Sequence, residues 1–199
     1  MKKYILFLLA VILVSCLNSK NVYYSKKHVQ TKSQNISISG RGRYSAEQLA
    51  AYVYKVNRKA KWESLKYLAR VYIREAAVEG VNHDVAFAQM CHETNYLRYG
   101  NQVKSWQHNF CGLGAVDNGG NGAVFPSAVI GIRAHIQHLK AYANTRPLKQ
   151  GLVDPRFKYV RRGMAPTVKH LTGTWASDRN YHNHLLRHIK AIGQAKALS

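Results

Sequence analysis

Acidic side chains are scarce in this sequence, which has nine aspartates and glutamates against 30 lysines and arginines and a formal net charge of +21. Such an excess of positive charge favours an anionic partner, such as nucleic acid, acidic lipid headgroups or an acidic polymer. A basic surface that serves only solubility is the alternative. Because acids are so few, the role of each can be considered separately.

The sequence also lacks an apolar run of the roughly 20 residues that a membrane-spanning helix needs. The apolar segment 4–14 is shorter and follows two lysines, which is the pattern of a signal peptide. It ends in the residues LVSC, which resemble the bacterial lipobox, where the cysteine is lipidated and becomes the first residue of the mature chain. We therefore predict a signal peptide over residues 1–15 and a fatty acyl chain such as palmitate on Cys16. Cleavage of an ordinary signal peptide nearby is the alternative.

Residues 16–43 contain no acid and no sustained apolar period, and they are rich in serine, asparagine, glutamine, lysine and arginine. This composition predicts a flexible tether. The remaining residues 44–199 suffice for one domain with a sizeable core, and we find no internal repeat. The expected protein is lipid-anchored in the cell envelope and faces the periplasm or the cell wall. Export argues against nucleic acid as its partner.

Helix signals dominate the predicted domain, so the fold class is expected to be mainly α. Ser45 and Gln48 form a capping-box pattern before an apolar run. In a later helix the apolar stripe leaves His135, His138 and Lys140 mostly outside it. The expected helices cover residues 46–57, 63–79, 84–97, 128–143 and 165–171, with a last one after Asp178.

Glu93 has a different setting from the other acidic residues. It lies near the end of the expected helix 84–97, where the helix dipole disfavours an anion. An irregular segment over residues 99–126 follows, rich in glycine and aromatic residues. Apolar surroundings there would raise the pKa of Glu93, as a general acid requires. A solvated glutamate at a helix end is the alternative.

Four separated motifs then occur in a fixed order along the chain. They read GVNHDVAFAQMCHETNYLRYG, HNFCGLGA, GIRAHIQHLKAYA, and DPRFKYVRRG followed by WASDRNY. In these motifs, over roughly residues 62–192, the chain resembles the bacterial glucosaminidase-domain family, the peptidoglycan N-acetylglucosaminidases related to flagellar and autolysin muramidases. The resemblance implies a lysozyme-like α fold and peptidoglycan glycan strands as the substrate. We expect a monomer without a cofactor. The implied reaction is hydrolysis of the β-1,4 bond between N-acetylglucosamine and N-acetylmuramic acid.

The same resemblance implies roles for single residues. Glu93 ends the family's AQ-x-x-x-E helix and corresponds to the proton donor, and Tyr181 corresponds to a tyrosine that faces it. Asn109, Phe110 and Gly112 match the N-[LF]-x-G segment that lines the substrate cleft.

Many members of the family carry a second acid on a small β-lobe after this N-[LF]-x-G segment. Only VDNGGNGAVFPS stands there in this chain, which predicts a reduced or absent β-lobe. Asp117 is the sole acid available, and a role in a turn is its alternative. Without it, the 2-acetamido oxygen of the substrate would act as an internal nucleophile, oriented by Tyr181.

Other side chains leave alternatives open. Tyr96 and Trp175 have aromatic faces that suit a sugar ring, although large aromatics are also common in cores. Cys91 and Cys111 form either a disulfide or two buried free thiols, since sequence does not supply the required geometry. Together with nearby histidines the cysteines fit no common zinc spacing, so we expect no metal.

Two other functions remain as alternatives to the enzyme. One is a non-catalytic peptidoglycan-binding lipoprotein with the same fold, which the short β-lobe suggests. The other is a general polyanion binder held at the membrane by lipid and charge, whose binding would weaken steeply with salt.

Overall fold

The computed structural model describes residues 35–100, 103–116 and 120–196. The predicted signal peptide, the lipidation at Cys16 and the candidate acid Asp117 lie outside these residues. The chain divides into a unit of residues 1–36 and a folded unit, Ser37–Ser199. Within the described residues, no helix has the length and apolar character needed to cross a membrane.

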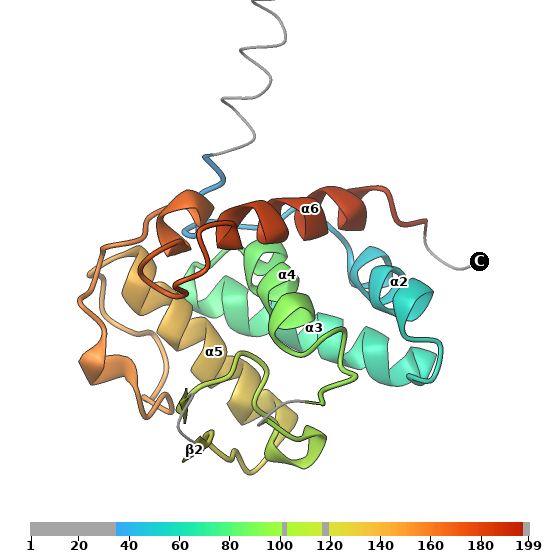
Figure 1. The fold of residues 1–199 in the computed structure, drawn as a ribbon, viewed down its shortest axis with the longest axis horizontal. Coiled ribbons are helices and arrows are strands. Elements are labelled where there is room, and N and C mark those ends of the chain that lie inside the picture. The colour runs from blue at the N-terminus through green and yellow to red at the C-terminus, as the bar shows by residue number, and fades with distance from the viewer. Residues whose placement is uncertain (1–34, 101–102, 117–119, 197–199) are drawn as a thin grey trace, which may run out of the picture. The chain divides into compact units, whose positions relative to one another are not determined.

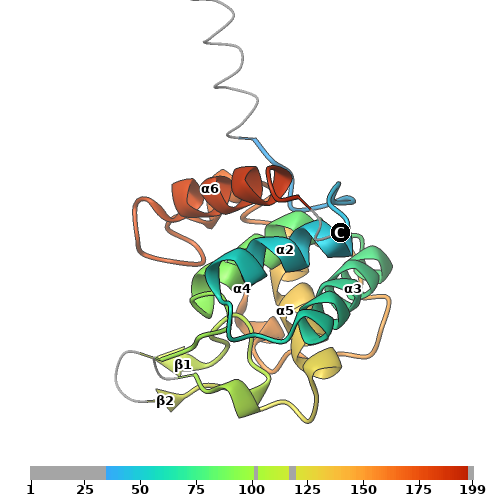
Figure 2. The same ribbon diagram turned by 90° about the vertical axis from the view of Figure 1, so that its right-hand side faces the viewer.

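The folded unit is mainly α, as predicted. Its helices are α2 (Ala46–Val56), α3 (Trp62–Glu79), α4 (His83–Glu93), α5 (Ala128–Ala143) and α6 (Tyr181–Gly193), with short 3-10 turns η1 (Ser105–Gln107), η2 (Phe157–Tyr159) and η3 (Val168–Leu171). An antiparallel hairpin joins β1 (Ala115–Val116) to β2 (Gly120–Asn121). This two-stranded hairpin is all that the described residues retain of a β-lobe, and Figure 2 shows it far from α6.

Local signals at the helix ends act as expected. Ser45 and Gln48 form the predicted capping box of α2. Gly80 ends α3 in the left-handed region with φ of 70°, a conformation in which glycine has no Cβ clash. The side chain of Asn82 accepts a hydrogen bond from the backbone N–H of Asp84 and caps α4. The boundaries of these helices therefore follow from their own sequences.

Helix α4 lies at the centre of the folded unit and contacts α3, α5 and α6 (Figure 1). Residues 83–91 are buried without interruption. A helix that is buried on every side has no polar face, which explains why its sequence shows little amphipathic pattern. The central position of α4 brings its last residue, Glu93, next to the segment before α6.

The sequence-based boundaries need two corrections in the helices. Helix α4 ends at Glu93 and does not continue to residue 97, because Asn95, Tyr96 and Leu97 adopt positive φ angles of 48°, 57° and 61°. A left-handed backbone cannot continue a right-handed helix. The helix expected over residues 165–171 is only the short 3-10 turn η3.

The expected tether is also too long, because the segment that begins at Ser37 is part of the folded unit. Ile38 is completely buried. Its N–H donates to the Pro166 carbonyl at 3.0 Å, and its carbonyl accepts from the Asn82 N–H at 2.8 Å. On either side of Ile38, Ser37 and Ser39 form isolated antiparallel β-bridges with Thr167 and Val81, which the polar composition of the segment does not indicate.

Of the two alternatives left open for Cys91 and Cys111, the structure has two buried free thiols and no disulfide between them. Cys111 packs in a cluster with Leu113, Phe125 and Ala134. Burial raises the pKa of both thiols above its usual range. Both cysteines therefore act as small apolar core residues.

Replacing Ile38 with alanine should lower the free energy of unfolding by roughly 2–4 kcal/mol, because it leaves a cavity in a closed core. Ile36→Ala is the matched control, since Ile36 is only partly buried. Urea denaturation of both variants measures the difference. Equal, small effects would indicate that the segment from Ser37 does not belong to the folded unit.

Candidate active site

The carboxyl group of Glu93 is held through one of its oxygens. The Tyr181 hydroxyl donates a hydrogen bond to Glu93 Oε1, and the Trp175 indole N–H donates to the same atom at 3.2 Å. Oε2 receives no hydrogen bond from the described residues, and it is not among the buried side-chain atoms that lack a partner. Glu93 Oε2 is therefore the oxygen that faces solvent.

Glu93 differs electrostatically from the other described acids. Each of those lies within ion-pair distance of a lysine, arginine or histidine. No described cation pairs with Glu93. Burial raises the pKa of its carboxyl group, and the hydrogen bonds from Tyr181 and Trp175 offset part of that rise. In a strongly basic chain, Glu93 is therefore kept away from the charges that would lower its pKa.

Tyr181 is itself held by a row of buried hydrogen bonds. Gln89 Nε2 donates to the Tyr181 oxygen at 2.8 Å, and Gln89 Oε1 lies 3.1 Å from His135 Nε2. The Tyr72 hydroxyl lies 3.0 Å from His135 Nδ1. An amide oxygen can only accept, so His135 carries its proton on Nε2 and accepts from Tyr72 through Nδ1.

This row, which we call the Glu93 relay, consists of Tyr72, His135, Gln89, Tyr181 and Glu93. Burial lowers the pKa of His135 to about 3, which keeps its ring neutral. Every donor in the relay then points toward Glu93, an arrangement in which successive hydrogen bonds strengthen one another. The relay leaves the Tyr181 proton directed at the Glu93 carboxyl group.

Sequence reasoning missed the inner members of this relay. His135 was expected mostly outside the apolar stripe of its helix, but it is completely buried. The available signal was the glutamine of the AQ-x-x-x-E motif, because Gln89 on a fully buried helix needs a polar partner.

The indole ring of Trp175 also packs against the rings of His138 and Tyr142. Its ring centroid lies 5.1 Å from that of His138 and 5.3 Å from that of Tyr142. His138 Nδ1 in turn lies 2.7 Å from Asp154 Oδ2. The structure therefore brings the predicted Trp175 to Glu93, where it is partly exposed.

The remaining predicted cleft residues have different positions. Asn109 is completely buried, and its side chain bonds Leu113 and Ala123 within its own loop. Phe110 is also buried in the core. Gly112 adopts φ of 71° in the same loop. Asn109 and Phe110 therefore face the interior of the protein, and Gly112 permits the left-handed turn of the loop.

Within the described residues, the hydrogen-bond and ring contacts of the Tyr96 side chain are with Tyr52 and His188 and with no member of the relay. Its hydroxyl lies 3.1 Å from that of Tyr52, and its ring packs against His188 at 5.4 Å. The structure therefore does not bring Tyr96 to the Glu93 carboxyl group. Among the described residues, no cluster of histidine, cysteine and acidic side chains is suited to a metal ion.

Comparisons with known proteins give one family and one relative. The model of the Glucosaminidase family, described as mannosyl-glycoprotein endo-beta-N-acetylglucosaminidase, matches residues 69–194. An uncharacterized protein of Borreliella burgdorferi is 39% identical over 182 residues, which cover 90% of this chain and 89% of that protein. No solved structure matches the chain.

Replacing Tyr181 with phenylalanine should raise the pKa of Glu93 further, because it removes a hydrogen bond that stabilises the carboxylate. Tyr142→Phe is the matched control, since that hydroxyl donates to the Thr174 carbonyl and does not bond Glu93. NMR titration of the glutamate carboxyl carbons measures the change. An unaltered pKa in the Tyr181 variant would contradict the hydrogen bond.

Proposed function

Since the chain belongs to the glucosaminidase family, we propose that it hydrolyses the β-1,4 glycosidic bonds of peptidoglycan as an N-acetylglucosaminidase with Glu93 as the general acid. The observation that carries the proposal is that Glu93, alone among the described acids, has no lysine, arginine or histidine within ion-pair distance. A carboxyl group with a raised pKa retains the proton that the leaving oxygen of a glycoside needs.

The hydrogen bonds indicate which oxygen gives up the proton. Oε1 already accepts from Tyr181 and Trp175, so the proton of the acid form resides on Oε2. Oε2 is also the solvent-facing atom and can approach the glycosidic oxygen of a bound strand. Tyr181 and Trp175 orient the acid, and they stabilise the carboxylate after proton transfer.

The group that assists attack at the anomeric carbon is a separate question. The other described acids contact a lysine, arginine or histidine, and Asp117 lies outside the described residues. The 2-acetamido oxygen of the substrate can attack in place of a second carboxylate. We favour this substrate-assisted route. Tyr181 was expected to orient the acetamido group, but its bonds to Glu93 and Gln89 support a role in orienting the acid.

We further propose that the enzyme acts in the cell envelope. The support is the sequence pattern of a signal peptide over residues 1–15 followed by Cys16, with lipid attached to that cysteine. A strongly basic, membrane-anchored domain would be held near anionic wall and membrane surfaces.

Replacing Glu93 with glutamine should abolish cleavage of purified peptidoglycan, because an amide has no acidic proton to donate. Glu63→Gln is the control, since Glu63 is exposed and pairs only with Lys66. Analysis of the reducing ends of the released muropeptides measures the reaction. New N-acetylglucosamine ends are expected with the wild type. No new ends would favour the non-catalytic binder, and N-acetylmuramic acid ends would show a muramidase.

The initial rate of cleavage should be highest at acidic pH and should fall as pH rises through the raised pKa of Glu93. Only the protonated carboxyl group can donate, so the rate follows the fraction of acid form. Assays from about pH 4 to 8 measure this fall in rate. A rate that increases over this range would be incompatible with Glu93 as the acid.

The same titration affects stability independently of activity. The contribution of Glu93 to the free energy of unfolding is fully present below its unfolded pKa, near 4.5, and is lost as pH rises through its higher folded pKa. Glu93→Gln should therefore have a higher Tm than the wild type at neutral pH, and the difference should shrink at acidic pH. Thermal denaturation at both pH values provides the comparison.

A further inference from the structure

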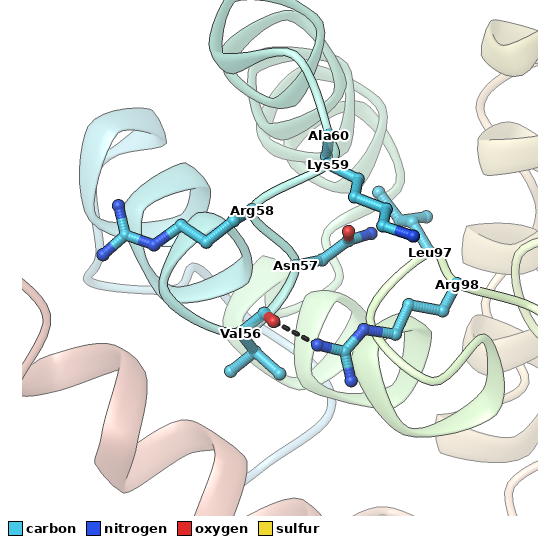
Figure 3. Close-up of a pocket in the computed structure, with 7 residues that line it drawn as sticks. All are labelled: Val56, Asn57, Arg58, Lys59, Ala60, Leu97 and Arg98. Atoms are coloured by element: carbon cyan, nitrogen blue, oxygen red, sulfur yellow. Dashed lines mark hydrogen bonds between the residues drawn. The ribbon is translucent and has the colours of Figure 1, made fainter.

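A cavity of about 800 Å³ lies beside the turn between α2 and α3 (Figure 3). Its lining consists of residues 56–60 together with Leu97 and Arg98. Leu97, with φ of 61°, and Arg98, which follows it, belong to the turn after Glu93 in which several residues adopt positive φ angles. The cavity is therefore built partly from the same segment that ends the helix of the proposed acid.

The cavity is positively charged and has no acid to neutralise it. Arg58, Lys59 and Arg98 are exposed members of its lining, and none forms an ion pair within the described residues. Glu63, the next acid along the chain, pairs with Lys66 at 2.7 Å. Uncompensated cations around a concave surface attract an anionic ligand.

Hydrogen bonds hold the cavity in shape before any ligand binds. Asn57 Nδ2 donates to the Tyr96 carbonyl at 2.9 Å, which joins the α2–α3 turn to the segment after Glu93. The Arg98 guanidinium donates to the Val56 carbonyl across the cavity. A fixed guanidinium loses little freedom when it binds an anion.

Figure 3 shows that the three cationic side chains of the cavity point in different directions. The Lys59 side chain extends from the α2–α3 turn toward the segment of Leu97 and Arg98, and Arg98 extends back toward Val56, whereas Arg58 points away from both. The Arg58 guanidinium lies 4.8 Å from the centre of the Tyr54 ring. Lys59 makes no hydrogen bond or ion pair within the described residues, so its ammonium group is available. Lys59 and Arg98 are the pair best placed to bind one anionic group.

We propose that this cavity binds a carboxylate of the peptide stem of peptidoglycan, through Lys59 and Arg98. The inference rests on the proposed function, because it places a peptidoglycan strand at Glu93. The two amino sugars of the strand are joined by uncharged glycosidic bonds, whereas the stems carry free carboxylates. Arginine and lysine bind such groups through charge-assisted hydrogen bonds. A stem held beside the segment after Glu93 would help to align the strand to which it is attached.

The test compares intact peptidoglycan with glycan strands from which an amidase has removed the stems. Amidase cleavage leaves a lactyl carboxylate on each N-acetylmuramic acid, so both substrates are anionic and only the intact one carries the carboxylates of the stem. The double variant Lys59→Gln/Arg98→Gln should lower kcat/KM on the stem-bearing substrate by about tenfold, the loss expected for two charge-assisted contacts near solvent. Its kcat/KM on stripped strands should remain within about twofold of wild type. Lys59→Gln alone should show a smaller loss with the same preference, and it removes no hydrogen bond within the described residues.

The control Lys169→Gln/Lys190→Gln removes the same charge from exposed positions outside the cavity lining. It should affect the two substrates alike. Equal losses on both substrates in the cavity variant, or no loss on the stem-bearing one, would overturn the proposal. Equal losses in the control and cavity variants would assign the effect to overall charge.

A binding measurement keeps this inference separate from the proposed activity. If the wild type cleaves neither substrate, the proposed function fails, but binding to immobilised intact peptidoglycan and to immobilised stripped strands still tests the cavity. In a Glu93→Gln background, stem-dependent binding should disappear when Lys59 and Arg98 are replaced. Retention that ignores the stems would refute the cavity site.

Discussion

The row of hydrogen bonds from Tyr72 through His135, Gln89 and Tyr181 to Glu93 is the interaction on which the rest of this structure depends. It crosses α3, α5, α4 and α6 in turn, so each helix supplies a polar group that another helix must satisfy. Loss of one member would leave a buried neighbour unpaired, at a penalty of about 1–3 kcal/mol. The packing of these helices and the orientation of the acid are therefore fixed by the same contacts.

A second constraint follows from the charge of the chain. With a net charge of +21, an acid would ordinarily find a cation close by and its pKa would fall. Every other described acid has a lysine, arginine or histidine within ion-pair distance, as in the buried pair of Glu79 and Lys140. The two described donors to Glu93, the indole N–H of Trp175 and the hydroxyl of Tyr181, are both neutral. The fold therefore keeps the described lysine, arginine and histidine side chains out of ion-pair distance of Glu93.

Sequence reasoning succeeded where the controlling contact is local. The ends of helices at Ser45 and Gly80 follow from side chains and backbone preferences within a few residues. It failed where the partner is distant, as with Ile38, which pairs with residues near 82 and 166, and with His135, whose partners lie on other helices. The position of Glu93 at a helix end could be read from sequence, but the relay behind it could not.

The abrupt end of α4 connects these features. A helix continued to residue 97, as its sequence suggests, would place the residues after Glu93 in register with α4. The side chain of Thr94 instead donates to the Met90 carbonyl at 2.7 Å and accepts from the Leu97 N–H at 2.9 Å, which stabilises the left-handed turn. Positive φ angles at non-glycine residues are unfavourable and persist only when surrounding contacts impose them. Here the imposed turn ends the helix at Glu93 and directs Arg98 toward the α2–α3 turn. The same turn therefore positions both the proposed acid and one side of the cationic cavity.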